Sequence, residues 1–402
     1  MERGEATRPL RILFIQESSW TRSLPLTSHH LAELLSCNGH HVTILDRDMM
    51  PPSFLKPVAV VADYSRLYPG ARIELITSAS VGLPLLSTFS GAISQVAVLT
   101  RAIQSADIAI LDSVITSGPL VVRICEAARV PVVFQMFDRL SHLTRFRFAN
   151  QLIRTFESDV YKRASKIVAV DEPLVEYAVS LGARRENCTC LPVLVDRERF
   201  SRARLEREDL RKQWHVEADK VILFTGRLFS FAGLDLIVQS FPDVLKSVPR
   251  AKLIIAGDGP LYPKLRSMVH VFGLKDRVSL LGRVPYDLIP ILNAIADVCI
   301  NPFRSDAVSD LAFPSKIGEY MAGGNPVIAS DLVGTTRVLE SAKGVILDRP
   351  ERLSEHIVRL LADKDLRERM GRDAALSAAE LFGVDVILPR FEEILRSVAY
   401  NV

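Results

Sequence analysis

Short apolar runs alternate with amphipathic segments along the chain, and this alternation predicts the fold class. Runs of about four to eight apolar and β-branched residues are typical of strands buried inside a parallel sheet. The segments between several of these runs have helical spacing, as in residues 28–39, which end at Gly39. Strands that alternate with helices form doubly wound sheets, so we expect an α/β fold.

The alternation occurs twice, which predicts two separate sheets. Five strand candidates in the first half occupy residues 10–16, 41–46, 106–113, 131–138 and 166–171. Six more in the second half occupy residues 221–227, 251–259, 278–284, 296–302, 325–330 and 344–348. A charged and irregular bridge, residues 191–220, separates the two series. We therefore expect two Rossmann-like domains facing a cleft, with ligands at the carboxyl ends of the strands.

Composition and charge restrict the class of partner. The 402 residues are 48% hydrophobic and 24% charged, which is enough for two domains with large cores. A net charge of +3 is too close to balance to indicate a nucleic acid partner, although residues 139–166 are locally basic. This basic run is typical of a solvated helix face, and the alternative interpretation is a surface for anionic lipid.

The cysteines and the apolar stretches indicate in which cellular compartment we expect the protein. Five scattered cysteines and an amino-terminal segment without an apolar signal region favour a reducing cytoplasm. Cys188 and Cys190 have the wrong spacing for a zinc site, and no G-x-G-x-x-G motif opens either series of strands, so we expect no metal and no cofactor. Residues 75–100 are uncharged but contain glycine and proline, which favours a loop followed by a buried or membrane-facing helix over a membrane span.

The segment FPSKIGEYMAGGNPVIASD, residues 313–331, predicts a phosphate-binding helix. A first turn at residues 314–317 offers unpaired N–H groups and the positive end of the helix dipole. Pro314 suits that turn because it has no N–H to lose, while Ser315 and Lys316 add a hydroxyl and a cation. Glu319 lies one turn deeper, where its carboxylate can accept two ribose hydroxyls. These groups suit a nucleotide diphosphate, and the alternative is a capped helix with a structural glutamate.

Ordered sequence blocks give a family resemblance. In the second half they are GRLFSFAGLDLIVQSF, LIIAGDGP, GLKDRVSLLGRV, ADVCINPFRSD and FPSKIGEYMAGGNPVIASDLVG. GHHVTIL, FESDVYKRASKIVAVDEPLVEYAVSLGA and LPVLVDRERF match more loosely in the first half. Together they resemble the family 4 glycosyltransferases of GT-B fold, which use nucleotide sugars with retention of anomeric configuration. The resemblance implies an acceptor-side domain at residues 1–195, a donor domain at 196–381 and a helix at 382–402 that crosses back to the first domain.

The resemblance also implies roles for individual residues. Arg227 and Lys316 approach the donor pyrophosphate as cations, and the backbone of residues 257–260 comes close to the ligand. Main-chain groups at Arg283 and Val284 read the base, and Glu319 binds the ribose. The implied substrate-binding residues are Gly226, Gly257, Asp258, Gly259, Arg283, Val284, Pro314, Ser315, Ile317 and Glu319.

Three positions depart from the family pattern. Ala232 stands where a second pyrophosphate cation is usual, Leu311 where an acid usually touches the sugar, and Phe137 where a histidine usually precedes Asp138. Candidates for the missing groups are Asp310, Asp138 and His142. The sequence therefore supports the nucleotide half of the site better than the sugar half.

From these observations we expect a cytoplasmic glycosyltransferase, with peripheral contact at the inner membrane face as an alternative. The catalytic candidates are Arg227, Lys316 and Asp138. Cations and a helix amino end stabilise the charge on a leaving diphosphate, so the expected partners are a nucleotide diphosphate sugar and a glycan or lipid-linked acceptor, without nucleic acid. The alternative function is a GT-B-like regulatory subunit that binds nucleotide without catalysis.

Overall fold

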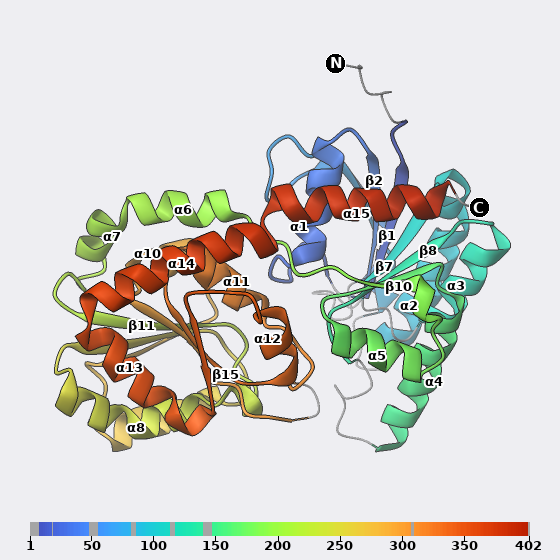
Figure 1. Cartoon of the computed structure of the whole chain (residues 1–402). Helices are drawn as coiled ribbons and strands as arrows, with labels where there is room; N and C mark the ends of the chain where they lie inside the picture. The colour runs from blue at the N-terminus through green and yellow to red at the C-terminus, as the bar shows by residue number, and fades with distance from the viewer. Residues whose placement is uncertain are drawn as a thin grey trace, which may run out of the picture. The chain divides into compact units, whose positions relative to one another are not determined.

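The computed structural model describes residues 8–17, 19–47, 55–81, 86–112, 117–139, 147–306 and 309–400. The chain forms two compact units: Met1–Leu191 with Leu388–Val402 make up unit 1, and Pro192–Ile387 make up unit 2. Each unit contains a largely parallel sheet flanked by helices (Figure 1). The predicted α/β fold with two Rossmann-like domains is therefore confirmed.

In unit 1 the described residues form an eight-stranded sheet with the order β10-β9-β8-β7-β1-β2-β5-β4. Neighbouring strands run parallel except for the edge strand β4, which is antiparallel to β5. The strands are β1 (Arg11–Gln16), β2 (His41–Asp46), β4 (Ala59–Tyr64), β5 (Ile73–Thr77), β7 (Ile108–Asp112), β8 (Val132–Met136), β9 (Lys166–Ala169) and β10 (Cys188–Cys190). A separate antiparallel pair joins β3 (Leu55–Lys56) and β6 (Ser80–Val81).

The helices of unit 1 connect these strands. They are α1 (Thr27–Cys37), α2 (Leu86–Ala102), α3 (Gly118–Ala127), α4 (Arg147–Arg163) and α5 (Glu172–Ser180), with short 3-10 turns at η1 (Ile103–Ser105) and η3 (Arg185–Asn187). The last helix, α15 (Val384–Ala399), starts in unit 2 and belongs to unit 1 from Leu388 onward. Glu392 on α15 accepts a hydrogen bond from Asn38 Nδ2 at 2.7 Å. The predicted return of the C-terminal helix to the first unit is thus confirmed.

In unit 2 the described residues form a six-stranded, fully parallel sheet with the order β13-β12-β11-β14-β15-β16. The strands are β11 (Lys220–Thr225), β12 (Ala251–Ala256), β13 (Val278–Gly282), β14 (Val298–Asn301), β15 (Val327–Ser330) and β16 (Val345–Asp348). The helices are α6 (Arg197–Leu205), α7 (Arg207–Gln213), α8 (Leu234–Ser247), α9 (Tyr262–Val271), α10 (Leu288–Ile295), α11 (Ser315–Ala322), α12 (Val333–Val338), α13 (Leu353–Ala362) and α14 (Lys364–Phe382), with 3-10 turns at η4 (Ser230–Ala232) and η5 (Pro350–Arg352).

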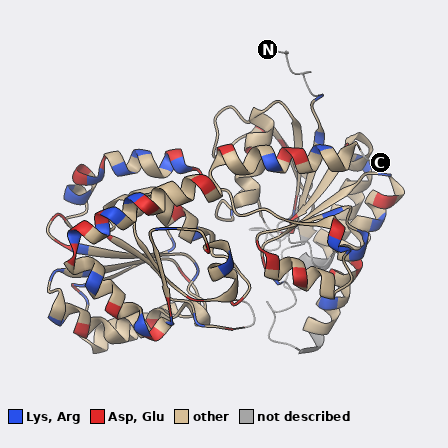
Figure 2. Cartoon of the chain, viewed as in Figure 1, with Lys and Arg blue, Asp and Glu red and all other residues tan. Residues whose placement is uncertain are grey.

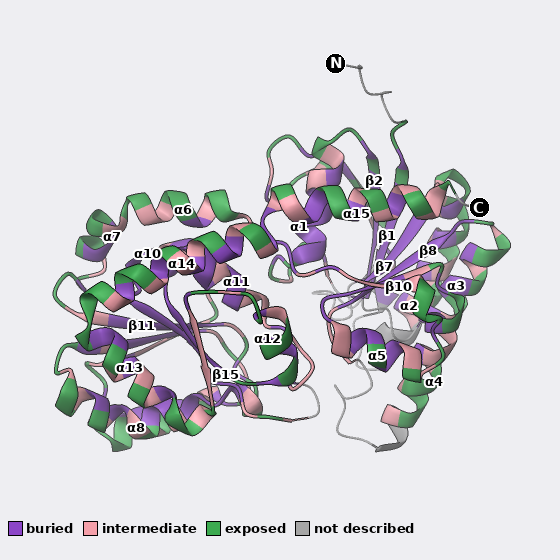
Figure 3. Cartoon of the chain, in the orientation of Figure 1, coloured by how far each residue is buried: buried purple, intermediate pink, exposed green. Residues whose placement is uncertain are grey.

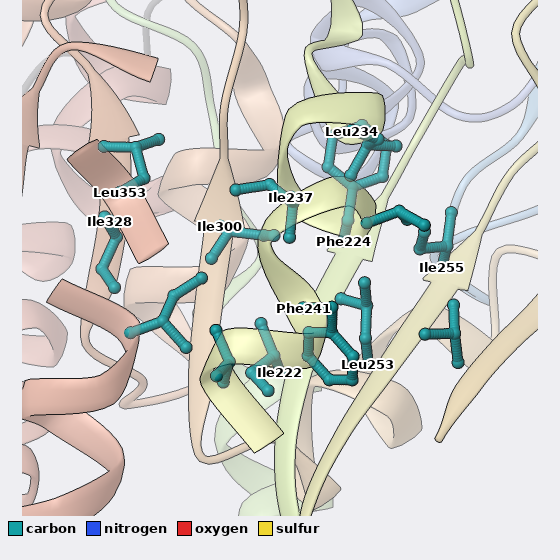
Figure 4. Close-up of a cluster of buried hydrophobic side chains, with 14 of the residues drawn as sticks. Ile222, Phe224, Leu234, Ile237, Phe241, Leu253, Ile255, Ile300, Ile328 and Leu353 are labelled. Atoms are coloured by element: carbon teal, nitrogen blue, oxygen red, sulfur yellow. The ribbon is translucent and has the colours of Figure 1, made fainter. Parts of the chain in front are cut away.

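The core of unit 2 holds the strands in place. Phe224 and Ile300 from neighbouring strands pack with Phe241 of α8 and Leu353 of α13, all without exposed surface (Figure 4). Burying a side chain of this size stabilises a fold by about 1.5 to 3 kcal/mol. The four inner strands are almost entirely buried and the edge strands β13 and β16 are mostly half-buried, while the helices expose one side (Figure 3). The turns at the carboxyl ends of the strands therefore start from a rigid base.

Two further observations concern the charges on the surface and the character of the helices. Lys and Arg are interspersed with Asp and Glu over the helices of each unit (Figure 2). Among the residues that the structure describes, no helix combines the length and the apolar character that crossing a lipid bilayer requires.

Candidate functional site

The candidate donor-binding residues of unit 2 all follow strands of its sheet. Gly226 and Arg227 come after β11, and residues 257–259 after β12. Arg283 and Val284 come after β13, and α11 starts in the segment after β14. Parallel strands place their carboxyl ends at one edge of the sheet, so these turns share that edge.

Main chain packs directly against main chain in the turns after β11 and β12. Gly226 N donates to Ala256 O at 2.9 Å, and Leu228 N donates to Asp258 O at 3.0 Å. A Cβ at Gly257 would lie 1.8 Å from Gly226 O, and one at Gly259 would lie 2.7 Å from Leu228 O. The two glycines are therefore required by this close approach.

Asp258 helps to shape the same turn. Its carboxylate accepts a hydrogen bond from Gly259 N at 2.8 Å, while the residue itself is exposed. This contact gives Asp258 a structural explanation that is independent of any ligand, and its predicted role in substrate binding stays a prediction.

Helix α11 presents an open amino end. Pro314 has an extended backbone and precedes the helix, which begins at Ser315, and no side chain of the described residues caps it. The sequence had placed Pro314 inside the first turn, so this boundary was wrong by one residue, because proline fits both positions. Ile317 is fully buried and donates its N–H to Pro314 O at 2.9 Å, so its predicted role in substrate binding stays a prediction. The amino end of a helix without a side-chain cap suits an anion.

A hydrogen bond ties α11 to the end of β11. The buried hydroxyl of Tyr320 accepts from Thr225 N at 2.7 Å and lies 3.1 Å from Thr225 Oγ1. Tyr320 is on the helix directly after Glu319, so this bond holds the helix against the strand that leads to Gly226. The sequence offered no signal for it, because the two residues are 95 positions apart.

Lys316 lies in an aromatic cage. Its Nζ is 4.2 Å from the ring centroid of Phe224 and 4.6 Å from that of Phe303. A Cβ on Gly226 would approach Nζ to 2.6 Å, so the ammonium lies directly beside that glycine. Burial lowers the pKa of Lys316 to about 7, and the nearby Glu319 offsets only part of this effect. The cation is therefore placed at the turn after β11 with little water around it.

Glu319 lies one turn further along α11. Tyr286 donates a hydrogen bond from its hydroxyl to Glu319 Oε1 at 3.4 Å, and the guanidinium of Arg199 lies 5.4 Å from the Tyr286 ring centroid. Burial raises the pKa of Glu319 to about 7, against the opposing effects of Lys316 and of the Tyr286 hydroxyl. Lys316 and Glu319 thus lie three residues apart on one helix, and both are difficult to keep charged without a ligand.

The remaining cationic candidates are at the surface. Arg227 is exposed, and its guanidinium lies 5.3 Å from the ring centroid of Phe229. Arg283 is exposed and Val284 is half-buried. Ser315 is half-buried at the helix start. These positions leave both arginine side chains accessible to a bound anion.

Ala232 is the first of the positions that depart from the family pattern. Ala232 is fully buried, so no charge reaches the ligand from that position. Beside it the sequence missed an ion-pair group, in which Asp235 lies 2.6 Å from Arg304 Nη1 and 2.6 Å from Lys264 Nζ. Arg304 N also donates to Phe231 O at 2.7 Å. Only tertiary structure brings these three charges together.

Asp310 and Leu311 are half-buried before α11. Asp310 Oδ2 accepts from Ser305 Oγ at 2.9 Å, so this acid has a partner within its own loop. The family usually has an acid at the position of Leu311, and replacement of that acid by Asp310 stays a prediction.

The candidate catalytic residue of unit 1, Asp138, lies in the segment after β8. Asp138 is half-buried next to Phe137, and burial followed by the charge of Asp112 raises the pKa of Asp138 to about 6. Asp171, which caps α5 by accepting from Leu174 N, has its pKa raised to about 7, mainly by burial. His142 lies outside the described residues. The catalytic role of Asp138 stays a prediction.

Within the described ranges, no three side chains of His, Cys, Asp or Glu are grouped as metal ligands would be. The site is built from cations, main-chain N–H groups and one acid.

Comparison with known proteins identifies the family of the chain. Residues 206–376 match the family model of "Glycosyl transferases group 1", and residues 26–193 match that of the "Glycosyl transferase 4-like domain". The two models together extend over both units. The chain therefore belongs to the glycosyltransferases of GT-B fold.

Individual proteins resemble parts or all of the chain. The α-D-kanosaminyltransferase of Streptomyces kanamyceticus is 26% identical over 195 residues, 48% of this chain and 49% of that protein. The GDP-mannose-dependent α-(1-6)-phosphatidylinositol monomannoside mannosyltransferase of Mycobacterium tuberculosis is 32% identical over 186 residues, 45% of this chain and 48% of that protein. The chain thus matches about half the length of these relatives.

A solved structure shares the fold over nearly the whole chain. Anabaena HepE in complex with UDP and glucose has a TM-score of 0.75 and 19% identity, covering 96% of this chain and 100% of that one. At this identity the likeness establishes the fold alone.

Proposed function

We propose that the protein transfers a sugar from a nucleotide diphosphate sugar to a glycan or lipid-linked acceptor with retention of anomeric configuration. The observation that carries the proposal is the amino end of α11, where caged Lys316 and Glu319 lie one turn apart. This order of groups suits pyrophosphate followed by ribose. Two similar proteins, a GDP-mannose-dependent mannosyltransferase and a structure in complex with UDP and glucose, support a nucleotide sugar.

The chemical demand of the reaction is the negative charge that grows on the leaving diphosphate. Lys316, the N–H groups of α11 and the accessible Arg227 supply positive charge for it without rearrangement. Gly257 and Gly259 let the main chain come close to the same group. We assign no protein nucleophile, and retention is supported by the family resemblance.

Turnover measurements test this function. The full chain is incubated with UDP-glucose or GDP-mannose and a panel of glycan and lipid-linked acceptors, and release of free nucleotide diphosphate is followed. Acceptor-dependent release is expected, with the new linkage keeping the donor anomer in NMR spectra. An inverted product would contradict retention. Tight donor binding without turnover on any acceptor would favour the non-catalytic subunit.

For a lipid-linked acceptor we propose peripheral membrane contact through α4. Arg154 and Leu152 are both exposed on this helix, with Leu152 47% accessible. Arg163 is less available, because it pairs with Glu126 and Asp159. Exposed cations and apolar side chains together bind anionic lipid surfaces, and salt screens the charged part.

Sedimentation with vesicles tests this contact. Binding to vesicles containing anionic phospholipid is expected to fall steeply with salt and to weaken in Arg154→Glu. Arg123→Ala on α3, where Arg123 already pairs with Asp159, is the matched control. Absence of binding at low salt would contradict the membrane contact and leave the glycosyltransferase proposal in place.

A further inference from the structure

The charges of Lys316 and Glu319 should differ between the free protein and the donor complex. Both side chains are half-buried on α11, and they are three residues apart, hence neighbours on one helix face. Nucleotide binding, as proposed above, needs Lys316 as an ammonium and Glu319 as a carboxylate.

Among the residues that the structure describes, Glu319 is the acid that supports the charge of Lys316. From β11 it meets the Phe224 ring and Gly226, and from the segment after β14 it meets the Phe303 ring. Arg227 in the same turn lies over Phe229, and Arg304 pairs with Asp235. Ring faces attract an ammonium, but they replace its water shell only in part.

The surroundings of Glu319 stabilise its charge only weakly. The Tyr286 hydroxyl is at the long distance of 3.4 Å. Arg199 lies over the ring of Tyr286 and bonds to Asp287 at 3.0 Å, and Arg283 is exposed in the turn before. The charge of Lys316 opposes the effect of burial on this carboxylate only in part.

Burial therefore acts on both partners in the same direction, toward the neutral forms. The pKa of Lys316 is lowered to about 7 and the pKa of Glu319 is raised to about 7, each mainly by burial. Near neutral pH the free pair holds about one proton in total, shared between an ion pair and a neutral amine with a neutral carboxyl group. The donor complex also needs one proton, and it must be on Lys316.

We propose that donor binding moves a proton from Glu319 to Lys316, so that the site is fully charged only when a nucleotide sugar occupies it. The O–H bond of the Glu319 carboxyl group breaks, and the proton joins the lone pair of the Lys316 amine. The total charge of the pair does not change. This inference rests on the proposed function, because both partners act on the same donor.

The transfer has a signature in the number of protons exchanged with solvent. Below neutral pH the free pair carries more than one proton and above it fewer than one, while the complex carries one. Binding should therefore release protons at pH 6, exchange almost none near pH 7 and take up protons at pH 8. By linkage, donor affinity is then highest near pH 7 and falls on both sides.

Calorimetric titration of the full chain measures these protons directly. UDP-glucose and GDP-mannose are the probes, because their pyrophosphate diesters do not titrate in this pH range. Each is titrated at pH 6, 7 and 8 in two buffers of different ionisation enthalpy. The dependence of the observed heat on the buffer gives the proton number, and its sign should reverse between pH 6 and pH 8.

Single variants separate the two partners. Glu319→Gln should keep the uptake at pH 8 and lose the release at pH 6, because only Lys316 still titrates. Lys316→Met should do the opposite. If Lys316→Met does not fold, Lys316→Arg gives the same test, since arginine stays charged. Lys246→Met and Glu355→Gln, exposed positions on α8 and α13, are the matched controls and should reproduce the wild-type sign reversal.

The outcomes distinguish this inference from the proposed function. A sign reversal that each variant removes on one side supports the proton transfer. Binding with a proton number that is zero or of one sign at all three pH values overturns the transfer and leaves the donor site standing. Absence of binding of both nucleotide sugars to the folded wild-type protein contradicts the proposed function itself.

Discussion

Replacing Gly226 by alanine tests whether the turn after β11 and the cage of Lys316 form one donor site. Gly226 has a φ of +127°, a conformation that side chains with Cβ rarely adopt. Such a conformation costs about 1 to 3 kcal/mol when it is imposed on another residue. The new Cβ would also lie 2.6 Å from Lys316 Nζ and 2.9 Å from its Cε. The flexible lysine side chain must therefore leave its place between the two phenyl rings.

Two measurable losses follow from this displacement. The strain should lower the melting temperature by about 2 to 12 °C, since about 2 to 4 °C corresponds to 1 kcal/mol at this size. Loss of one charge-assisted contact, about 1.5 to 3 kcal/mol, should weaken binding of UDP or GDP by roughly 10- to 100-fold. Thermal unfolding and calorimetric titration measure the two losses separately.

Gly273→Ala is the matched control for the Gly226 variant. Gly273 also has a positive φ, +67°, but a Cβ there would meet nothing within 4 Å. It lies between α9 and β13, outside the candidate site. We expect Gly273→Ala to lower the melting temperature and to leave nucleotide affinity unchanged. Affinity within twofold of wild type in Gly226→Ala, despite a lower melting temperature, would refute the placement of Lys316 at the donor phosphate.

Three further changes address other charges of unit 2. Arg227→Ala should lower kcat/KM by about 100-fold, as loss of a fixed charge at the leaving group does, and an enzyme within twofold of wild type would place the leaving group elsewhere. Glu319→Ala should bind the nucleotide diphosphate and its 2′-deoxy analogue equally, whereas retained discrimination in titrations would contradict the ribose contact. Burial opposes ionisation of Asp235, but its bonds to Arg304 and Lys264 outweigh burial and lower its pKa to about 2. The stabilisation is therefore present above about pH 4 and lost as the pH falls toward 2, so Asp235→Asn should flatten acid unfolding over that window, and an unchanged acid transition would show that the pair contributes nothing.

The fold class was predictable because it depends on local periodicity. Each strand of unit 2 was found from a run of apolar residues, and the inner strands have such runs because a strand buried on both faces has to be apolar along its length. In unit 1 the edge strand β4 escaped prediction because five of its six residues are exposed, and β10 because it has only three residues. The inner strand β5 was missed as well: it overlaps residues 75–100, whose start was wrongly expected to be a loop, because β5 is short and one of its residues is charged and exposed. Strand order along the sheets has no local signal either.

The candidate site was likewise predictable from the sequence only in part. The sequence alone determined which residues follow the strands of unit 2, and therefore that Arg227, the glycine turn and the start of α11 share one edge of a sheet. Only the tertiary structure decided what surrounds Lys316 and Glu319. Phe224 is 92 positions away from Lys316 in the sequence, and its ring removes water from the amine only because the strand and the helix pack together. Desolvation depends on every neighbour in space, so no sequence pattern could show that both charges of the pair are costly in the free protein.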